Sequence, residues 1–310
     1  MIPYLYISAS SYSGSTLLAF LLNTHPRIAT ISEAEGWSWN DGEDYRCSCG
    51  ARVPDCVFFR ELAAAFAVAK LPFDFRNFGT RFALSADGRR NRLLTGPLPG
   101  ALGKVEPLRD ALLWRLPGTS GELRRALAAN RVLVDTALAH FGAQAFVDAA
   151  KSPHRLNHLA RDPRLQLTAV HLVRDPRAFA ASVRRKWGMP LEASVARWAR
   201  EQAQIERVLR RFERRSVLHY ETLCSQPQTA VDRLTDALGL ERHTLPADFR
   251  GVEHHILGNA MRLGGAGDVR CDERWRDELD DQARERIDGA IMRSASRYRL
   301  PVELLPADAF

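Results

Sequence analysis

The stretch YISASSYSGSTLLAFLLNTHP, residues 6–26, decides how the rest of the chain is interpreted. An apolar segment, expected as a strand over 4–9, runs into a Ser/Gly turn, and the turn opens directly into an apolar helix expected over 15–23. The helix should end at THP, since the residue before Pro26 is pushed out of helical geometry. The first N–H groups of a helix lack partners and attract anions, so this order indicates a phosphate-binding loop.

The turn lacks the lysine of the common nucleotide-binding loop, GxxxxGK[ST], which reaches the last two phosphates of a nucleotide. The matching residues here are Ser-Gly-Ser-Thr at 13–16. Gly14 permits a tight backbone, and the neighbouring hydroxyl groups add hydrogen-bond donors. Taken alone, these residues also suit a plain turn; their place between a strand and a buried helix favours a phosphate site. The missing lysine weakens an ATP-using interpretation.

A second anion motif is VHLVRDPRAFAAS, residues 170–182. Arg174 follows directly on a buried strand, Pro176 starts a helix, and Ser182 lies two turns along it. An arginine at the end of a buried strand makes sense if its guanidinium binds a phosphate above the sheet. The alternative is a surface pair of Arg174 with Asp175, or a helix cap.

Strands and helices alternate along the remainder of the chain. Further elements are expected as strands at 145–149, 167–173 and 216–220 and as helices at 191–212, 227–240 and from about 272. This alternation predicts one α/β domain over 1–310, with a central parallel sheet that helices cover on both faces. Residues 57–130 are expected to be a helical insertion with irregular links. Ligands of such sheets bind at the carboxyl ends of the strands.

Composition limits the partners. The chain of 310 residues carries a net charge of +7, with 44 Lys and Arg against 37 Asp and Glu, and only four of the basic residues are lysines. A GC-rich genome explains the arginine excess, although guanidinium groups also suit oxyanions. No helix-turn-helix, zinc-finger or aromatic stacking motif is visible, so no nucleic-acid partner is expected. With no signal-peptide pattern and no apolar run of about 18 residues, we expect a cytoplasmic protein without a membrane span.

Three of the five cysteines lie in CSCGARVPDC, residues 47–56. Cys47, Cys49 and Cys56 offer three thiols, but C-x-C-x6-C is not a common zinc-finger spacing and a fourth ligand would have to come from elsewhere. A disulfide would need an oxidising compartment. A local loop staple or free buried thiols are preferred, and no metal is expected.

Together, the two motifs resemble those of the sulfotransferase superfamily, whose donor is 3′-phosphoadenosine 5′-phosphosulfate (PAPS) and whose nucleotide product is adenosine 3′,5′-bisphosphate (PAP). SSYSGSTLLAFLLNTHP resembles the loop for the 5′-phosphosulfate, and LVRDPRAFAAS resembles the 3′-phosphate motif. LHYETLCSQPQTAVDRLTDALGL is similar to a later strand and helix, and GNAMRLGGAGD (258–268) to a loop that closes over the nucleotide. The resemblance runs from 4 to about 275 and is weakest over 57–130.

The resemblance implies which residues hold the donor. Arg174, Ser182 and Arg262 would bind the 3′-phosphate, which ATP lacks, and no metal is required because backbone donors already hold the leaving group. The other implied donor contacts are Tyr12, Ser13, Gly14, Ser15, Thr16, Leu17, Tyr220 and Asn259.

One position departs from the family pattern. Members often carry Lys or Arg immediately before the Ser-Gly of the loop, where this chain has Tyr12. Lys151, just past the second predicted strand, is our candidate for the missing cation, although an exposed loop lysine is the alternative. Glu33 is the candidate base, by similarity to the protein-tyrosine branch of the superfamily; Glu35 and His154 stay open as alternatives.

The expected function is sulfuryl transfer from PAPS to a hydroxyl or amine of a carbohydrate, lipid or small metabolite. Trp37 and Trp39 would line the acceptor pocket or simply pack, and the 57–130 insertion would shape that side. The alternative is another nucleotide-binding P-loop protein, either a kinase-like enzyme or a non-catalytic binding module. An inactive relative is a third option, given Tyr12.

Overall fold

A computed structural model describes residues 1–36, 45–98, 100–264 and 267–306. Its centre is a five-stranded sheet in the order β2-β3-β1-β4-β5, with all neighbouring strands parallel. The strands are β1 (Ile2–Ala9), β2 (Ile28–Ser32), β3 (Ala145–Lys151), β4 (Leu165–Val173) and β5 (Arg215–His219). The predicted α/β class, with a central parallel sheet between helices, is confirmed.

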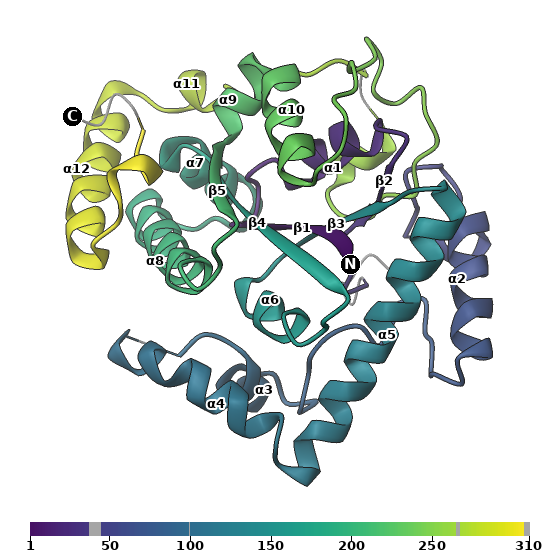
Figure 1. Cartoon of the computed structure of the whole chain (residues 1–310). Coiled ribbons are helices and arrows are strands. Elements are labelled where there is room, and N and C mark those ends of the chain that lie inside the picture. Colours follow the sequence, from purple (N-terminus) through teal and green to yellow (C-terminus); the bar gives the residue numbers. More distant parts are fainter. Residues whose placement is uncertain (37–44, 99, 265–266, 307–310) are drawn as a thin grey trace.

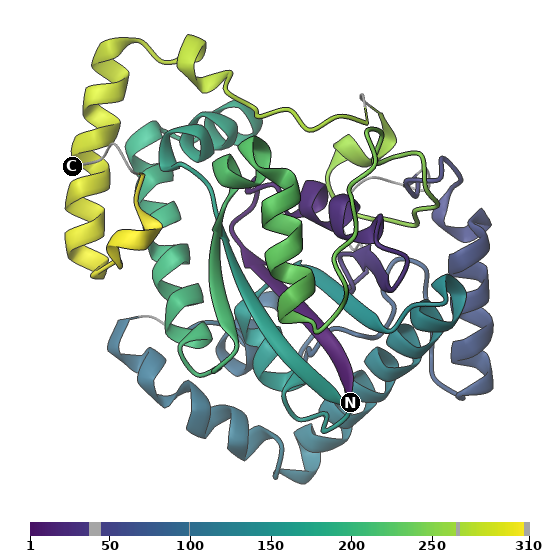
Figure 2. The ribbon, with the colours of Figure 1, turned by 45° about the horizontal axis from the view of Figure 1, so that its top comes forward.

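Helices cover both faces of the sheet, as Figures 1 and 2 show. Side chains alternate along β1: Tyr4 and Tyr6 enter the core on one face, while Leu5 and Ile7 enter the core on the other. The Leu5 face packs against α1 (Ser15–Asn23), α9 (Tyr220–Ser225) and α10 (Pro227–Ala237). The Tyr4 face packs against α2 (Val57–Val68), α5 (Pro117–Phe141), α6 (Pro153–Leu159) and the end of α8 (Leu191–Leu209).

A third apolar cluster lies beyond β5 and joins α7 (Pro176–Trp187), α8 and the C-terminal helices. The predicted helix from about 272 is wrong as one element, because the chain forms α11 (Trp275–Glu278) and then α12 (Asp281–Tyr298). The break lies at Leu279, whose backbone is extended, and Asp280 then caps α12 by accepting a hydrogen bond from Ala283 N–H.

The region expected to be an insertion contains α2, α3 (Gly88–Thr95), α4 (Glu106–Leu113) and the first part of α5, which continues past 130 to Phe141. A buried arginine ties it to the sheet. Arg155 Nε donates to Asp148 of β3 at 2.9 Å, and its Nη1 donates to the Thr80 carbonyl at 2.7 Å. No helix in the described part of the chain is both long enough and apolar enough to cross a bilayer.

Candidate active site

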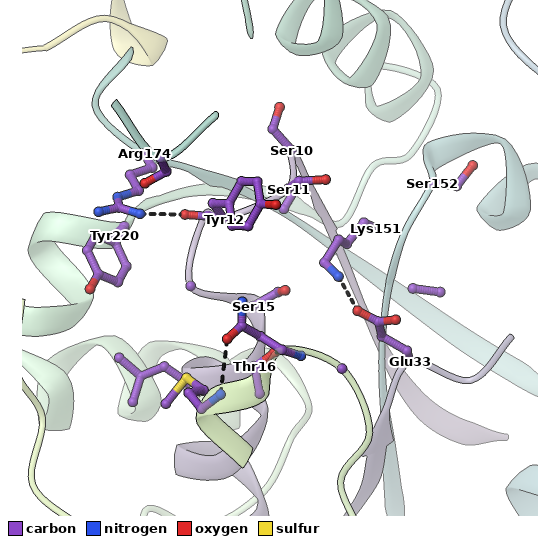
Figure 3. A pocket seen from close by; sticks show the side chains of 18 of the residues that line it. Ser10, Ser11, Tyr12, Ser15, Thr16, Glu33, Lys151, Ser152, Arg174 and Tyr220 are labelled. Carbon is purple, nitrogen blue, oxygen red and sulfur yellow. Dashed lines mark hydrogen bonds and ion pairs between the residues drawn. The ribbon is translucent and has the colours of Figure 1, made fainter. Parts of the chain in front are cut away.

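Four strand ends meet at one large cavity. The loop after β1, Glu33 after β2, Lys151 at the end of β3 and Arg174 after β4 all line it (Figure 3). In the sheet, β2 and β3 lie on one side of β1, and β4 and β5 lie on its other side. The strand order therefore reverses at β1, and the cavity lies at this topological switch point. Its volume of about 1190 Å³ exceeds that of an ordinary single-ligand pocket.

The turn before α1 has the geometry of an anion cradle. Gly14 is the N-cap with φ of 85°, and no side chain caps the helix. The first N–H group bonded within the helix is that of Leu18, which donates to the Gly14 carbonyl, so the earlier N–H groups face the cavity end of the helix. Ser13 Oγ is buried and has no hydrogen-bond partner among the described residues. These donors fit a phosphate group, which would satisfy them.

Gly14 is required for close packing as well as for its backbone. A Cβ at this position would lie 2.4 Å from Cδ2 of Tyr220, which is far inside van der Waals contact. The Tyr220 ring therefore packs directly against the turn before α1, and its hydroxyl accepts a hydrogen bond from Asp272 N–H at 3.0 Å.

Three non-glycine residues at or beside the cavity have left-handed backbones. Tyr12 (φ 62°) and Lys151 (φ 71°) line the cavity, and Ser32 (φ 64°) directly precedes Glu33, which lines it. Each such residue costs about 1–3 kcal/mol and persists only where the surroundings determine it. Arg174 holds Tyr12, because its Nη1 donates to the Tyr12 carbonyl at 2.8 Å. The Tyr12 ring also packs against the Trp187 ring in a T-shaped arrangement, with the ring centroids 5.5 Å apart. All three end a strand or begin the loop after one, so the strain is concentrated where the site is built.

Arg174 points into the cavity region and is almost fully buried. Its Nη2 lies 3.0 Å from the Asp272 carbonyl and 3.2 Å from Asp272 Oδ2, and its guanidinium lies 4.8 Å above the Tyr220 ring. Arg174 Nε has no partner among the described residues. Asp175 caps α7 by accepting a hydrogen bond from Arg177 N–H.

Ser182 lies on the buried side of α7, 3.4 Å from Arg185 Nη2, and also lines the cavity. Further cations surround these residues, and no sequence motif indicates them because they come from separate segments. Among the described residues the lining carries eight Lys or Arg side chains and five carboxylates. The unforeseen cations are Arg81, Arg185, Lys186, Arg250, Arg270 and Arg274.

Glu33 and Lys151 form an ion pair beside the turn before α1 (Figure 3). Gly258, with φ of 116°, lies over this pair: a Cβ there would be 3.3 Å from Glu33 Oε1 and 3.1 Å from Thr16 Oγ1. The structure therefore brings together the predicted base, the predicted cation and the loop hydroxyl around one glycine.

The alternative bases are held by other groups. Glu35 lies 3.9 Å from both Arg81 and Arg155, and burial raises the pKa of its carboxyl against the lowering effect of these arginines. His154 is buried, with Nε2 3.4 Å from Glu106 Oε1. Both residues line the cavity on the side of the insertion.

Of the two predicted donor contacts in the C-terminal loop, Asn259 lines the described part of the cavity and Arg262 does not. Asn259 lines the cavity, and its N–H donates to Thr16 Oγ1 at 3.3 Å. Arg262 is not among the residues described as lining the cavity: it is buried over the Tyr45 ring at 4.0 Å and donates to the Arg46 carbonyl. Arg262 therefore supports the loop in this structure and is not brought to Arg174. Trp37 and Trp39 lie outside the described residues.

No protein-family model matches the sequence, and no curated protein matches it. Among solved structures, the sulfotransferase domain of the olefin synthase from Synechococcus PCC 7002 superposes with a TM-score of 0.50 at 17% identity, covering 97% of this chain and 95% of that chain. The sulfotransferase domain from the curacin biosynthetic pathway gives a TM-score of 0.48 at 15% identity, covering 99% of both chains. Retinol dehydratase, in complex with androsterone and the inactive cofactor PAP, gives 0.40 at 14% identity, covering 96% of this chain and 82% of that chain. The chain has the sulfotransferase fold, as predicted.

Proposed function

We propose that the chain is a sulfotransferase that uses PAPS and transfers its sulfuryl group to a hydroxyl or amine of a small-molecule acceptor. The observation that supports the proposal most is that one cavity is lined both by the lysine-free Ser/Gly turn before α1 and by Arg174 and Ser182, which would bind a second anionic group. The fold shared with the olefin synthase sulfotransferase domain supports it. A nucleoside triphosphate has no group for the second site.

The residues present fit such a donor. The N–H groups at the start of α1, with the hydroxyls of Ser13, Ser15 and Thr16, would hold the 5′ end, and Ser13 Oγ would gain the partner it lacks. Arg174 and Ser182 would hold the 3′-phosphate, and Tyr220 would flank the nucleotide at Gly14. When bound, PAPS supplies an electrophilic sulfuryl group on a phosphate leaving group.

Glu33 is assigned as the base that takes the proton of the attacking acceptor. Its ion pair with Lys151 fixes the carboxylate beside the phosphate loop, where the acceptor has to approach. Lys151 in turn supplies the positive charge that the loop lacks at Tyr12 and stabilises charge building on the leaving group. The reaction as proposed requires no metal.

The acceptor would occupy the part of the cavity next to the insertion. There the lining comprises Glu35, Arg81, Pro97, His154 and Ile205, and two of these, Arg81 and Pro97, come from the 57–130 region. The mixed apolar and charged wall suits a small molecule with a ring or chain and a reactive hydroxyl.

The test is transfer of radiolabelled sulfate from PAPS to a panel of phenols, primary alcohols and amino sugars. We expect label on one acceptor class with wild type and loss of that label with Glu33→Gln. Transfer of the γ-phosphate of ATP to the same acceptors, with none from PAPS, would replace this proposal by the kinase-like alternative.

A further inference from the structure

A cluster of four metal-binding side chains lies outside the lining of the cavity, as far as the structure describes it. Cys47, Cys49 and Cys56 come from the segment after β2, and His255 comes from the segment before Gly258. One ligand atom from each lies within 4.8 Å of all the others, and every residue except Cys49 is buried. The fourth ligand that the cysteine spacing lacks is thus a histidine about 200 residues away in sequence.

The distances suit tetrahedral coordination. In a zinc site with Zn–S bonds of about 2.3 Å and a Zn–N bond of about 2.0 Å, sulfur atoms lie about 3.8 Å apart and a sulfur lies about 3.5 Å from the nitrogen. Here Cys49 Sγ is 3.7 Å from Cys56 Sγ, and His255 Nδ1 is 3.7 Å from Cys47 Sγ and 3.2 Å from Cys56 Sγ. Small side-chain movements would bring all four onto one ion.

The backbone around the thiols is arranged for thiolates. Cys47 and Gly50 enclose a tight turn, in which the Gly50 N–H donates to the Cys47 carbonyl and Gly50 has φ of 87°. Cys56 is the N-cap of α2, where the helix dipole favours negative charge.

His255 is oriented as a metal-ligating histidine. Its Nε2 lies 2.9 Å from Glu253 Oε1, and a carboxylate acceptor there places the proton on Nε2 and leaves the Nδ1 lone pair toward the sulfur atoms. The ring is stacked on Phe58 at 5.6 Å with an interplanar angle of 15°. A second group, His140 with Glu253 and His255, is the weaker candidate because Glu253 is 63% exposed and already serves as the hydrogen-bond partner of His255.

We propose that the chain binds one structural Zn²⁺ ion through Cys47, Cys49, Cys56 and His255. Four protein ligands leave no open position, so the ion would have no part in the chemistry. Three thiolates and one imidazole select zinc over the oxygen-preferring cations.

The ion would fasten two segments that border the active site. Ser48 already links them, since its hydroxyl donates to the His254 carbonyl at 2.9 Å and accepts from Ile256 N–H at 2.8 Å. Two residues past Ile256, Gly258 donates its N–H to the Tyr45 hydroxyl and lies over Thr16 and Glu33. Zinc would thereby hold the C-terminal loop in place over the phosphate loop.

The test uses the full-length protein purified from zinc-supplemented cells without a metal-affinity tag. We expect one equivalent of zinc per chain by mass spectrometry, with X-ray absorption giving three sulfur neighbours at about 2.3 Å and one nitrogen at about 2.0 Å. Replacement by Co²⁺ should give the visible bands of a tetrahedral thiolate site. Chelation should lower the melting temperature, and one equivalent of zinc should restore it.

The variants are Cys47→Ser and His255→Gln, with Cys271→Ser as the matched control because Cys271 is also a free cysteine and lies outside the cluster. The first two should lose the zinc, and the control should keep it. Less than a tenth of an equivalent of zinc in the wild type, an oxygen-only coordination shell, or a Cys49–Cys56 disulfide in the purified protein would each overturn the proposal. The absorption measurement on the wild type decides the matter even if a variant does not fold.

Discussion

Replacing Arg174 with alanine should remove discrimination between nucleotides more than it removes binding. The guanidinium is buried, and its Nε lacks a partner among the described residues. Charge-assisted hydrogen bonds to a phosphate contribute about 1.5–3 kcal/mol, so the dissociation constant for PAP should rise by about 10- to 150-fold. ADP has no 3′-phosphate, so its affinity should fall only through loss of the Arg174 support to the Tyr12 carbonyl.

The assay is calorimetric titration of PAP and ADP into the wild type, Arg174→Ala and Arg184→Ala. Arg184 is the matched control, because it lies on α7, the helix that follows Arg174, and is exposed outside the lining described for the cavity. The expected result is a fall in the PAP-to-ADP affinity ratio in Arg174→Ala alone. Equal losses for both nucleotides leave the ratio unchanged, and this result would refute the 3′-phosphate assignment and show that Arg174 only supports the loop.

Glu33→Gln should lower kcat for sulfuryl transfer by about 100- to 10,000-fold while PAP affinity is retained, and normal turnover in stopped assays would remove this residue as the base. Lys151→Ala should lower kcat by about 100-fold or more, whereas a pure rise in KM would indicate a binding role only. Gly14→Ala should cost at least about 1–2 kcal/mol from its left-handed backbone alone and abolish PAP binding, as read from melting curves with and without PAP. The pKa of Glu206 is lowered from 4.5 to about 2, and the main cause is its side-chain hydrogen bond with His171. A carboxylate with a lowered pKa stabilises the fold above pH 4.5 and loses that contribution as the pH falls toward 2. Glu206→Gln should therefore reduce the change with acid pH of the free energy of unfolding measured in urea. An unchanged dependence on pH would contradict this.

Sequence reasoning succeeded where the signal is local. The strand, turn and helix over β1 and α1 follow from adjacent residues, and so does Pro176 at the start of α7. It missed β2, because IATIS is only five residues long and mixes small and polar side chains that the pairing with β3 buries. The break at Leu279 was hidden by an apolar spacing that continues across it.

The site was only partly predictable, because its chemistry depends on contacts between distant segments. The direction of Arg262 is set by Tyr45, which no pattern within GNAMRLGGAGD encodes. Gln202 is a polar residue among the buried residues of α8, and its Nε2 donates to Ser10 Oγ in the loop after β1 at 2.8 Å, a contact between distant segments. No sequence pattern indicates His255 as the proposed zinc ligand, because it lies about 200 residues from the cysteines in sequence.

The central claim is that this cavity recognises a nucleotide with phosphates at both the 3′ and the 5′ positions. The most direct measurement is calorimetric titration of the wild-type protein with PAP, ADP and ATP under identical conditions. The account predicts that PAP binds at least about 10-fold more tightly than ADP or ATP, because only PAP reaches Arg174 with a phosphate. Equal affinity for the three nucleotides, or a preference for ATP, would contradict it.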